Sequence, residues 1–171
     1  MGAGKNFRRG LANAFGLLKS PGTALSLARI FPRKRFRKIP KTVSEISRGE
    51  IVPFWARDRQ GRRFGTLLLS KSVPENEMAL ALSKFPSLSG KKVMGVSYLA
   101  VKSPLEERGK LHSRSLFGDA KQWLSSNGYS ALVITANDRM TRVYSRYGFV
   151  SAGQIKLPDG RTTTCSVLLI K

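Results

Sequence analysis

The residues with the clearest chemical potential lie between Tyr98 and Phe149. A basic turn, residues 103–110, follows a β-type segment and precedes a helical pattern. Free backbone N–H groups at the start of such a helix suit an anionic group such as a pyrophosphate. Tyr144 follows one helix and one strand later, where its phenol could act on the far end of the same ligand. We therefore expect a site that binds an extended anionic ligand and does chemistry at its other end.

Hydrophobic periodicity predicts the elements that must position these groups. Strands are expected at residues 51–57, 63–69, 92–101, 131–136, 149–157 and 162–171. Helices are expected at residues 75–84, 108–127 and 138–147, the last of them capped by Asn137 or Asp138 and closed by Gly148. Strands that alternate with helices and end in a hairpin indicate an α/β fold with a mixed, mostly antiparallel central sheet flanked by helices.

The net charge of +21 over 171 residues predicts an anionic partner, such as RNA, DNA or a ribonucleoprotein. A small domain stays soluble with a charge of only about 2–8. Residues 1–44 contain no acid, and their densest basic run is interpreted as a strip that contacts phosphates. Phe31 and Phe36 interleave with these charges, and we expect their rings to stack on bases. The alternative is a solvated linker whose two aromatic rings pack back on the domain. The predicted nucleic-acid contacts are Arg33, Lys34, Arg35, Arg37 and Lys38.

The N-terminal region divides the chain into a basic helical arm, residues 1–45, and a folded domain, residues 46–171. Apolar residues recur at helical spacing in residues 7–18, and a second short helix is expected at residues 23–31. These helices either pack on the domain's own sheet or contact a membrane surface or a partner. No apolar run reaches the roughly 18 residues of a transmembrane span.

Cys165 and His112 are the only cysteine and the only histidine. An internal disulfide is therefore impossible, and no metal site is expected. Cys165 lies in a β-type stretch and is expected to be a small core residue. A reducing compartment such as the cytoplasm fits this cysteine usage.

Two motifs carry a family likeness. The turn Arg108–Ser113 reads Arg-Gly-Lys-Leu-His-Ser and opens a helix after a strand. Downstream, Asn137, Tyr144 and the pair Gly148-Phe149 follow at fixed spacing. In this order, over residues 46–171, the chain resembles the GCN5-related N-acetyltransferase (GNAT) superfamily.

The resemblance implies that acetyl-CoA is bound and that its acetyl group passes to an amine. The pyrophosphate would lie on the amides of the turn, and the strand ending at Val101 would hold the pantetheine arm. Tyr144 would protonate the departing thiolate as a general acid. The alternative is that Tyr144 only packs, bonded to a carbonyl, and Asn137 only caps a helix. The implied cofactor contacts are Leu99, Val101, Arg108, Gly109, Lys110, Leu111, His112, Ser113 and Asn137.

Two departures from the family pattern leave the activity open. Leu111 stands where the family has a small residue, so the cofactor turn is degenerate. The strand at residues 92–101 has no acid to serve as general base, which leaves Glu75 and Glu77 as candidates. An active enzyme would acetylate an amine, on aminoacyl-tRNA or a ribosomal protein where the charge fits best. An inactive one would be a structural or nucleic-acid-binding protein of a ribonucleoprotein or a virion.

Overall fold

A computed structural model describes residues 21–58, 60–102, 112–157 and 159–170. These residues form a six-stranded sheet in the order β1-β2-β3-β4-β6-β5. The strands are β1 (Ile51–Arg57), β2 (Arg63–Ser70), β3 (Lys92–Val101), β4 (Tyr129–Ala136), β5 (Val150–Lys156) and β6 (Thr162–Leu169). Strands β3 and β4 are parallel, and the other neighbouring pairs are antiparallel. The predicted mixed, mostly antiparallel sheet is therefore confirmed.

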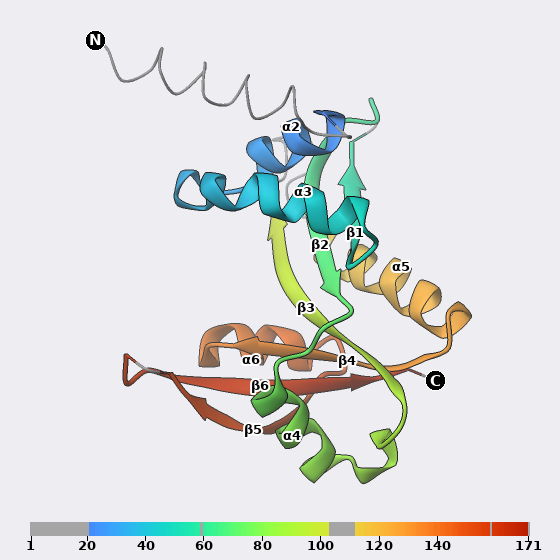
Figure 1. The fold of residues 1–171 in the computed structure, drawn as a ribbon, viewed down its shortest axis with the longest axis vertical. Helices are drawn as coiled ribbons and strands as arrows, with labels where there is room; N and C mark the ends of the chain where they lie inside the picture. Colours follow the sequence, from blue (N-terminus) through green and yellow to red (C-terminus); the bar gives the residue numbers. More distant parts are fainter. Residues whose placement is uncertain (1–20, 59, 103–111, 158, 171) are drawn as a thin grey trace.

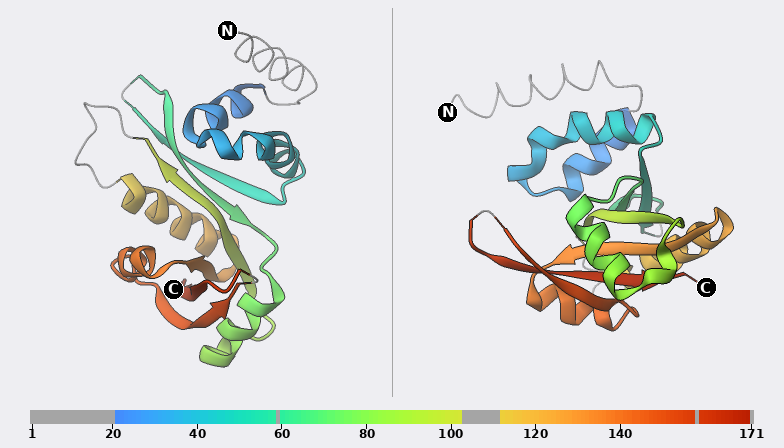
Figure 2. Two further views of the ribbon diagram at one scale, coloured as in Figure 1. Left: turned by 90° about the vertical axis from the view of Figure 1, so that its left-hand side faces the viewer. Right: turned by 60° about the horizontal axis from the view of Figure 1, so that its bottom comes forward.

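Helices cover both faces of this sheet (Figures 1 and 2). Helices α5 and α6 share one hydrophobic cluster with β2, β3 and β4. Helices α2 and α3 cover the opposite face near β1 and β2, and α4 covers that face near β5 and β6. The helical segments are α2 (Pro21–Ile30), η1 (Arg33–Lys38), α3 (Ile39–Ser47), α4 (Glu75–Lys84), η2 (Pro86–Leu88), α5 (His112–Ser126) and α6 (Asp138–Ser145).

Strand β2 shows why helices are needed on both faces. Its run Leu67-Leu68-Leu69 is apolar without alternation, as in strands buried on both sides. Leu67 and Leu69 pack in the cluster with α5, whereas Leu68 packs in the cluster with α2 and α3. All three are at most 1% exposed. The sheet is thus the middle layer of three.

Helices α2 and α3 are part of this three-layer structure. Leu27 of α2 and Val43 of α3 are at most 1% exposed and pack with Ile51 and Leu68 of the sheet. The expectation that the second N-terminal helix packs on the domain's own sheet is confirmed. The expected boundary at residues 45/46 falls inside α3 and would cut this cluster. The expected helix over residues 7–18 lies outside the described residues.

Helix α3 was missed at the sequence level, where residues 32–41 read as a basic strip. Its signal is nevertheless present, because Ile39, Val43 and Ile46 recur at i, i+4 and i+7. Pro40 occupies the first turn, where its missing N–H costs nothing. The preceding lysines and arginines form the 3₁₀ helix η1. The basic run is therefore a helical segment that leads directly into α3.

Replacement of Leu27 by alanine tests the docking of α2 on the sheet. Leu27 is completely buried, so Leu27→Ala should lower the free energy of unfolding by about 2–5 kcal/mol in urea titrations. The matched control is Leu25→Ala on the same helix, because Leu25 is 49% exposed and should cost less than about 0.5 kcal/mol. Equal losses for the two variants would contradict the packing described.

Candidate functional site

The sheet opens between its two parallel strands. Strand β3 pairs with β4 only from Lys92 to Gly95, opposite Tyr129 to Val133. Beyond Gly95, β3 continues beside β2 as far as Val101, while β4 turns away, as Figure 1 shows. Within the described chain, no strand pairs with the β4-facing edge of β3 from Val96 to Val101, a span of about 17 Å at 3.3 Å per step. This V-shaped opening presents backbone N–H and C=O groups that no described strand pairs, as an extended ligand would need.

A β-bulge lies at the apex of the opening. Leu68 pairs with Tyr98 and Leu69 with Val96, so Ser97 has no partner on β2. An extra residue of this kind twists a strand and redirects its edge. The bulge follows the last β3–β4 pair by two residues, so it marks the point where the two strands part.

Helix starts lie toward the open end of the V. Helix α5 begins at His112, after β3, and α6 begins at Asp138, directly after β4. Asn137 caps α6, because its side-chain oxygen accepts the Met140 backbone N–H at 3.0 Å, and this confirms the predicted cap. Helix N-termini attract anions, so a phosphate group at this end would be stabilised.

The predicted cofactor contacts fall partly within the described chain. Leu99 and Val101 lie on β3 beyond the split and pack partly buried against the α5-side cluster. His112 and Ser113 lie in the first turn of α5, but their side chains are outside the description. Arg108, Gly109, Lys110 and Leu111 lie outside the described residues. Their predicted contact with pyrophosphate stays a prediction.

Tyr144 is a buried phenol on α6. The residue is 6% exposed, and its ring packs edge-on against Phe117 and beside Phe149 at centroid distances of 6.0 and 5.8 Å. Burial raises the pKa of Tyr144, with a further contribution from Tyr147, so the hydroxyl keeps its proton at neutral pH. No described residue hydrogen-bonds that hydroxyl. The group is therefore a proton donor with no carbonyl partner in the described chain.

The basic segment η1 presents only part of its charge to solvent. The Arg35 guanidinium lies 4.5 Å above the Tyr98 ring, a cation–π contact that holds it on β3. Arg37 and Lys38 are exposed, whereas the side chains of Arg33 and Lys34 lie outside the description.

The prediction that Phe31 stacks on bases is wrong. Phe31 is 3% exposed and packs edge-on against Tyr98 at 4.4 Å. Phe36 is half-buried against the same cluster. Both rings pack back on the domain because the sheet face beneath α2 and α3 needs apolar cover.

The structure also places the acids. Glu75 is exposed and Glu77 half-buried at the start of α4, which packs on β5, β6 and β4. Glu45 of α3 and Glu50 before β1 instead line a cavity of about 470 Å³ together with Ser97 of the bulge. Sequence reasoning missed both glutamates because it did not recognise α3.

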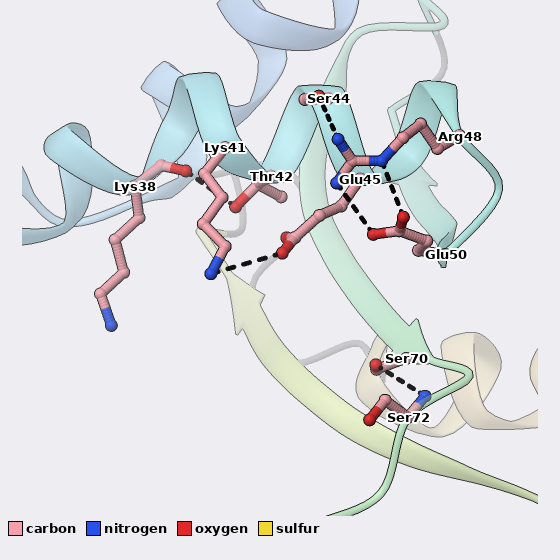
Figure 3. A network of polar contacts seen from close by, with 9 residues as sticks. All are labelled: Lys38, Lys41, Thr42, Ser44, Glu45, Arg48, Glu50, Ser70 and Ser72. Carbon is pink, nitrogen blue, oxygen red and sulfur yellow. Dashed lines mark hydrogen bonds and ion pairs between the residues drawn. The ribbon is translucent and has the colours of Figure 1, made fainter.

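Glu50 forms an exposed ion pair with Arg48 at this cavity. Arg48 donates to Glu50 from Nε at 2.7 Å and from a terminal nitrogen at 3.0 Å, as Figure 3 shows. The Arg48 hydrogen bonds lower the pKa of the Glu50 carboxyl. Glu45 forms an ion pair with the Lys41 ammonium group at 3.7 Å.

Other site chemistries find no support in the described chain. No group of three histidine, cysteine or acidic side chains gathers as a metal site within the described residues. Each helix in the described part of the chain is too short or too polar to cross a bilayer. Cys165 is fully buried, its thiol lies 3.6 Å from the Glu77 carbonyl oxygen, and burial raises its pKa to about 11.

Solved structures of acetyltransferases and of an N-acyl amino acid synthase superpose on this chain. A protein described as a GNAT-family acetyltransferase from Desulfovibrio desulfuricans superposes with a TM-score of 0.67 at 14% identity, over 88% of this chain and 94% of that one. The GNAT-family N-acetyltransferase YhbS from Escherichia coli, crystallised with CoA, gives 0.61 at 22% identity, over 89% and 76%. FeeM, an N-acyl amino acid synthase from uncultured soil microbes, gives 0.59 at 16% identity, over 96% and 91%.

No family model matches the sequence, and no curated protein is similar to it at the sequence level. The likeness is therefore one of structure. The chain has the GNAT fold, a mixed six-stranded sheet with flanking helices. The resemblance expected from the basic turn and the Tyr144 motif is confirmed at the level of the fold.

The buried thiol of Cys165 tests the packing of α4 on the sheet. An aromatic disulfide reagent at pH 8 should leave Cys165 unmodified in the native protein and modify it fully in urea. The physical reason is that the thiolate is the nucleophile, and a pKa of about 11 with full burial keeps the thiolate scarce and inaccessible. Rapid modification of the native protein would contradict the packing of α4 on β6.

Proposed function

We propose that this chain binds an acyl-CoA in the V between β3 and β4 and transfers its acyl group to an amine. The observation that carries the proposal is the unpaired edge of β3, with the starts of α5 and α6 toward its open end. The pantetheine arm is itself a chain of amides. It can pair with a free strand edge in the way that a neighbouring strand would. The unpaired length, about 17 Å, is of the order of that extended arm.

The residues that would hold acyl-CoA divide by position. The main chain of β3 around Leu99 and Val101 would bind the pantetheine amides. The first turn of α5, with His112 and Ser113, and the preceding residues Arg108, Gly109, Lys110 and Leu111 would bind the phosphates, where the helix dipole favours negative charge. Asn137 would hold the start of α6 in place. Acetyl-CoA is the simplest donor that such a site would use.

Tyr144 would supply the proton of the reaction. The amine nitrogen attacks the thioester carbonyl carbon, and the C–S bond breaks as the sulfur leaves. A thiolate is a better leaving group when it is protonated as it departs, which is general acid catalysis. Burial keeps Tyr144 protonated, and its hydroxyl has no partner among the described residues.

The acceptor that we favour is carried on a nucleic acid, such as aminoacyl-tRNA, or on a ribosomal protein, and the protein would act in the cytoplasm, where acyl-CoA is available. The support for this choice is the charge of +21 and the exposed side chains of Arg37 and Lys38 on η1. Neutralised phosphates release counterions, which strengthens such binding at low salt. The second candidate, a catalytically inactive nucleic-acid-binding protein of a ribonucleoprotein or a virion, rests on the same basic surface.

Binding of acetyl-CoA and the Tyr144→Phe variant test the enzyme proposal. Calorimetry with the nucleic-acid-free protein should show acetyl-CoA binding, and Tyr144→Phe should bind it equally well. Turnover of the variant should fall by roughly 10²–10⁴-fold, because only the proton is lost. Tyr129→Phe is the control, since Tyr129 stacks on Trp123 away from the split and should turn over normally. Equal turnover in wild type and Tyr144→Phe would rule out the acid role.

Charge removal on η1 tests the nucleic-acid proposal. The double variant Arg37→Gln/Lys38→Gln should reduce the slope of log affinity against log salt for RNA by about 1–2, because each lost phosphate contact removes roughly one counterion. The double variant Lys91→Gln/Lys92→Gln is the control. It removes the same charge from two exposed lysines at the start of β3, whereas η1 contacts β3 at Tyr98. If both variants change the slope equally, binding is non-specific and η1 is not the contact surface.

A further inference from the structure

Cations gather beside α2, where β1 and β3 end and β2 begins (Figure 1). Arg57, the last residue of β1, pairs in register with Arg63, the first residue of β2. Lys102 follows β3, and its backbone N–H donates to the Phe64 carbonyl oxygen next to Arg63. The Lys102 ammonium group donates to the Arg29 carbonyl oxygen, near the end of α2, at 2.8 Å. Four segments of the chain thus bring their cations to one end of the sheet.

The same basic surface continues along β3 to η1. The Arg35 guanidinium of η1 covers the ring of Tyr98, which precedes Lys102 by four residues, or about 13 Å at 3.3 Å per residue. Arg37 and Lys38 follow on η1 and are exposed. We call this surface the basic strip, and its described members are Arg29, Arg35, Arg37, Lys38, Arg57, Arg63 and Lys102.

No carboxylate of the described chain forms an ion pair with the basic strip. The ion pairs among the described residues use other cations, namely Lys41, Arg48, Arg62 and Arg161. Burial lowers the pKa of Arg63, and the neighbouring charge of Arg57 lowers it further. The fold therefore holds like charges together at a cost in free energy. An anion bound along the strip would relieve that repulsion.

Two arginines of the strip lie over aromatic rings. The Arg63 guanidinium carbon is 4.5 Å from the centroid of the Trp55 ring, and that of Arg35 is 4.5 Å from the centroid of Tyr98. Arg63 also donates to the Ser26 hydroxyl of α2 at 3.4 Å. All four side chains of these two pairs are partly exposed. A guanidinium held over a ring in this way presents a planar surface on which a nucleic-acid base can stack.

The two arginine–aromatic pairs share one face of the sheet. Trp55 and Tyr98 both pack against the cluster beneath α2 and α3. Trp55 lies opposite Thr66 of β2, and Thr66 lies opposite Ala100 of β3. Two strand spacings and two residues along β3 therefore separate Trp55 from Tyr98, a distance of about 12 Å. One extended strand of nucleic acid can reach both pairs.

We propose that the basic strip binds single-stranded nucleic acid, with bases stacked on the Arg63/Trp55 and Arg35/Tyr98 pairs and phosphates on the exposed cations. Bases of a single strand are free to stack on protein side chains, whereas those of a duplex are already stacked on one another. The inference rests on the nucleic-acid partner proposed above and is independent of acyl transfer. It extends the contact surface from η1 to the ends of three strands.

A charge-conserving variant tests the stacking. Arg63→Lys keeps the charge and loses the planar guanidinium. Affinity of the full-length, nucleic-acid-free protein for labelled oligouridylate of about 12 nucleotides should fall roughly 5-fold or more, as measured by fluorescence anisotropy. Its salt dependence should not change. An abasic oligonucleotide of equal length should bind wild type and Arg63→Lys equally, because it has phosphates and no bases. Arg142→Lys, at an exposed position of α6 on the other face, is the control and should bind as wild type.

A charge-removing variant tests the phosphate contacts. Arg57→Gln/Lys102→Gln should reduce the slope of log affinity against log salt by about 1.4, since each phosphate contact on a single strand contributes about 0.7. The same reduction is expected with the abasic oligonucleotide. Both side chains are exposed, so the variant should unfold at the same urea concentration as wild type.

Four outcomes would overturn the inference: equal oligouridylate binding by wild type and Arg63→Lys, equal affinity of wild type for abasic and ordinary strands, tighter binding of duplex RNA than of the single strand, and an unchanged salt slope in Arg57→Gln/Lys102→Gln. Binding of phosphatidylserine vesicles without binding of RNA would assign the strip to a membrane and overturn it as well. Thiol release with a small amine measures acyl transfer separately, so either proposal can fail while the other stands.

Discussion

The parting of β3 from β4 after Gly95 is the constraint on which the rest of the structure depends. Buried backbone N–H and C=O groups nearly always have hydrogen-bond partners. An opening inside a sheet therefore survives only if packing holds its two sides apart and a ligand or water satisfies the edges. Both halves of this sheet keep their own antiparallel ladders, β1-β2-β3 on one side and β4-β6-β5 on the other. The parallel contact joins them over a few residues.

Helix α5 holds the halves together where strand hydrogen bonds do not. Leu116 and Leu124 of α5 are at most 1% exposed and pack in one cluster with Leu67 and Leu69 of β2 and Leu132 of β4. Each fully buried leucine contributes about 1.5–3 kcal/mol relative to exposure. The opening is thus stabilised by apolar burial beneath it, and its edges stay free for a ligand. The same helix starts toward the open end, where its dipole favours an anion.

Exposed cations dominate the surface of the described chain. Most of the lysines and arginines in that part are exposed and can attract phosphate groups. Acids such as Asp58 and Asp159 form local ion pairs with Arg62 and Arg161. The cavity beneath α3 mixes both signs of charge, because Glu45 and Glu50 line it together with Arg48 and Lys71.

The sequence by itself determined most of the elements and the class of fold. β1 and β3 match their expected bounds, as does α4, because each has a clear period and is bounded by turn residues. Asn137 was recognisable as a cap because capping is local chemistry. Only the tertiary structure decided that Phe31 is buried and that Glu45 lines the same cavity as Ser97. These outcomes depend on contacts between residues far apart in the chain, which spacing along a single strand or helix does not encode.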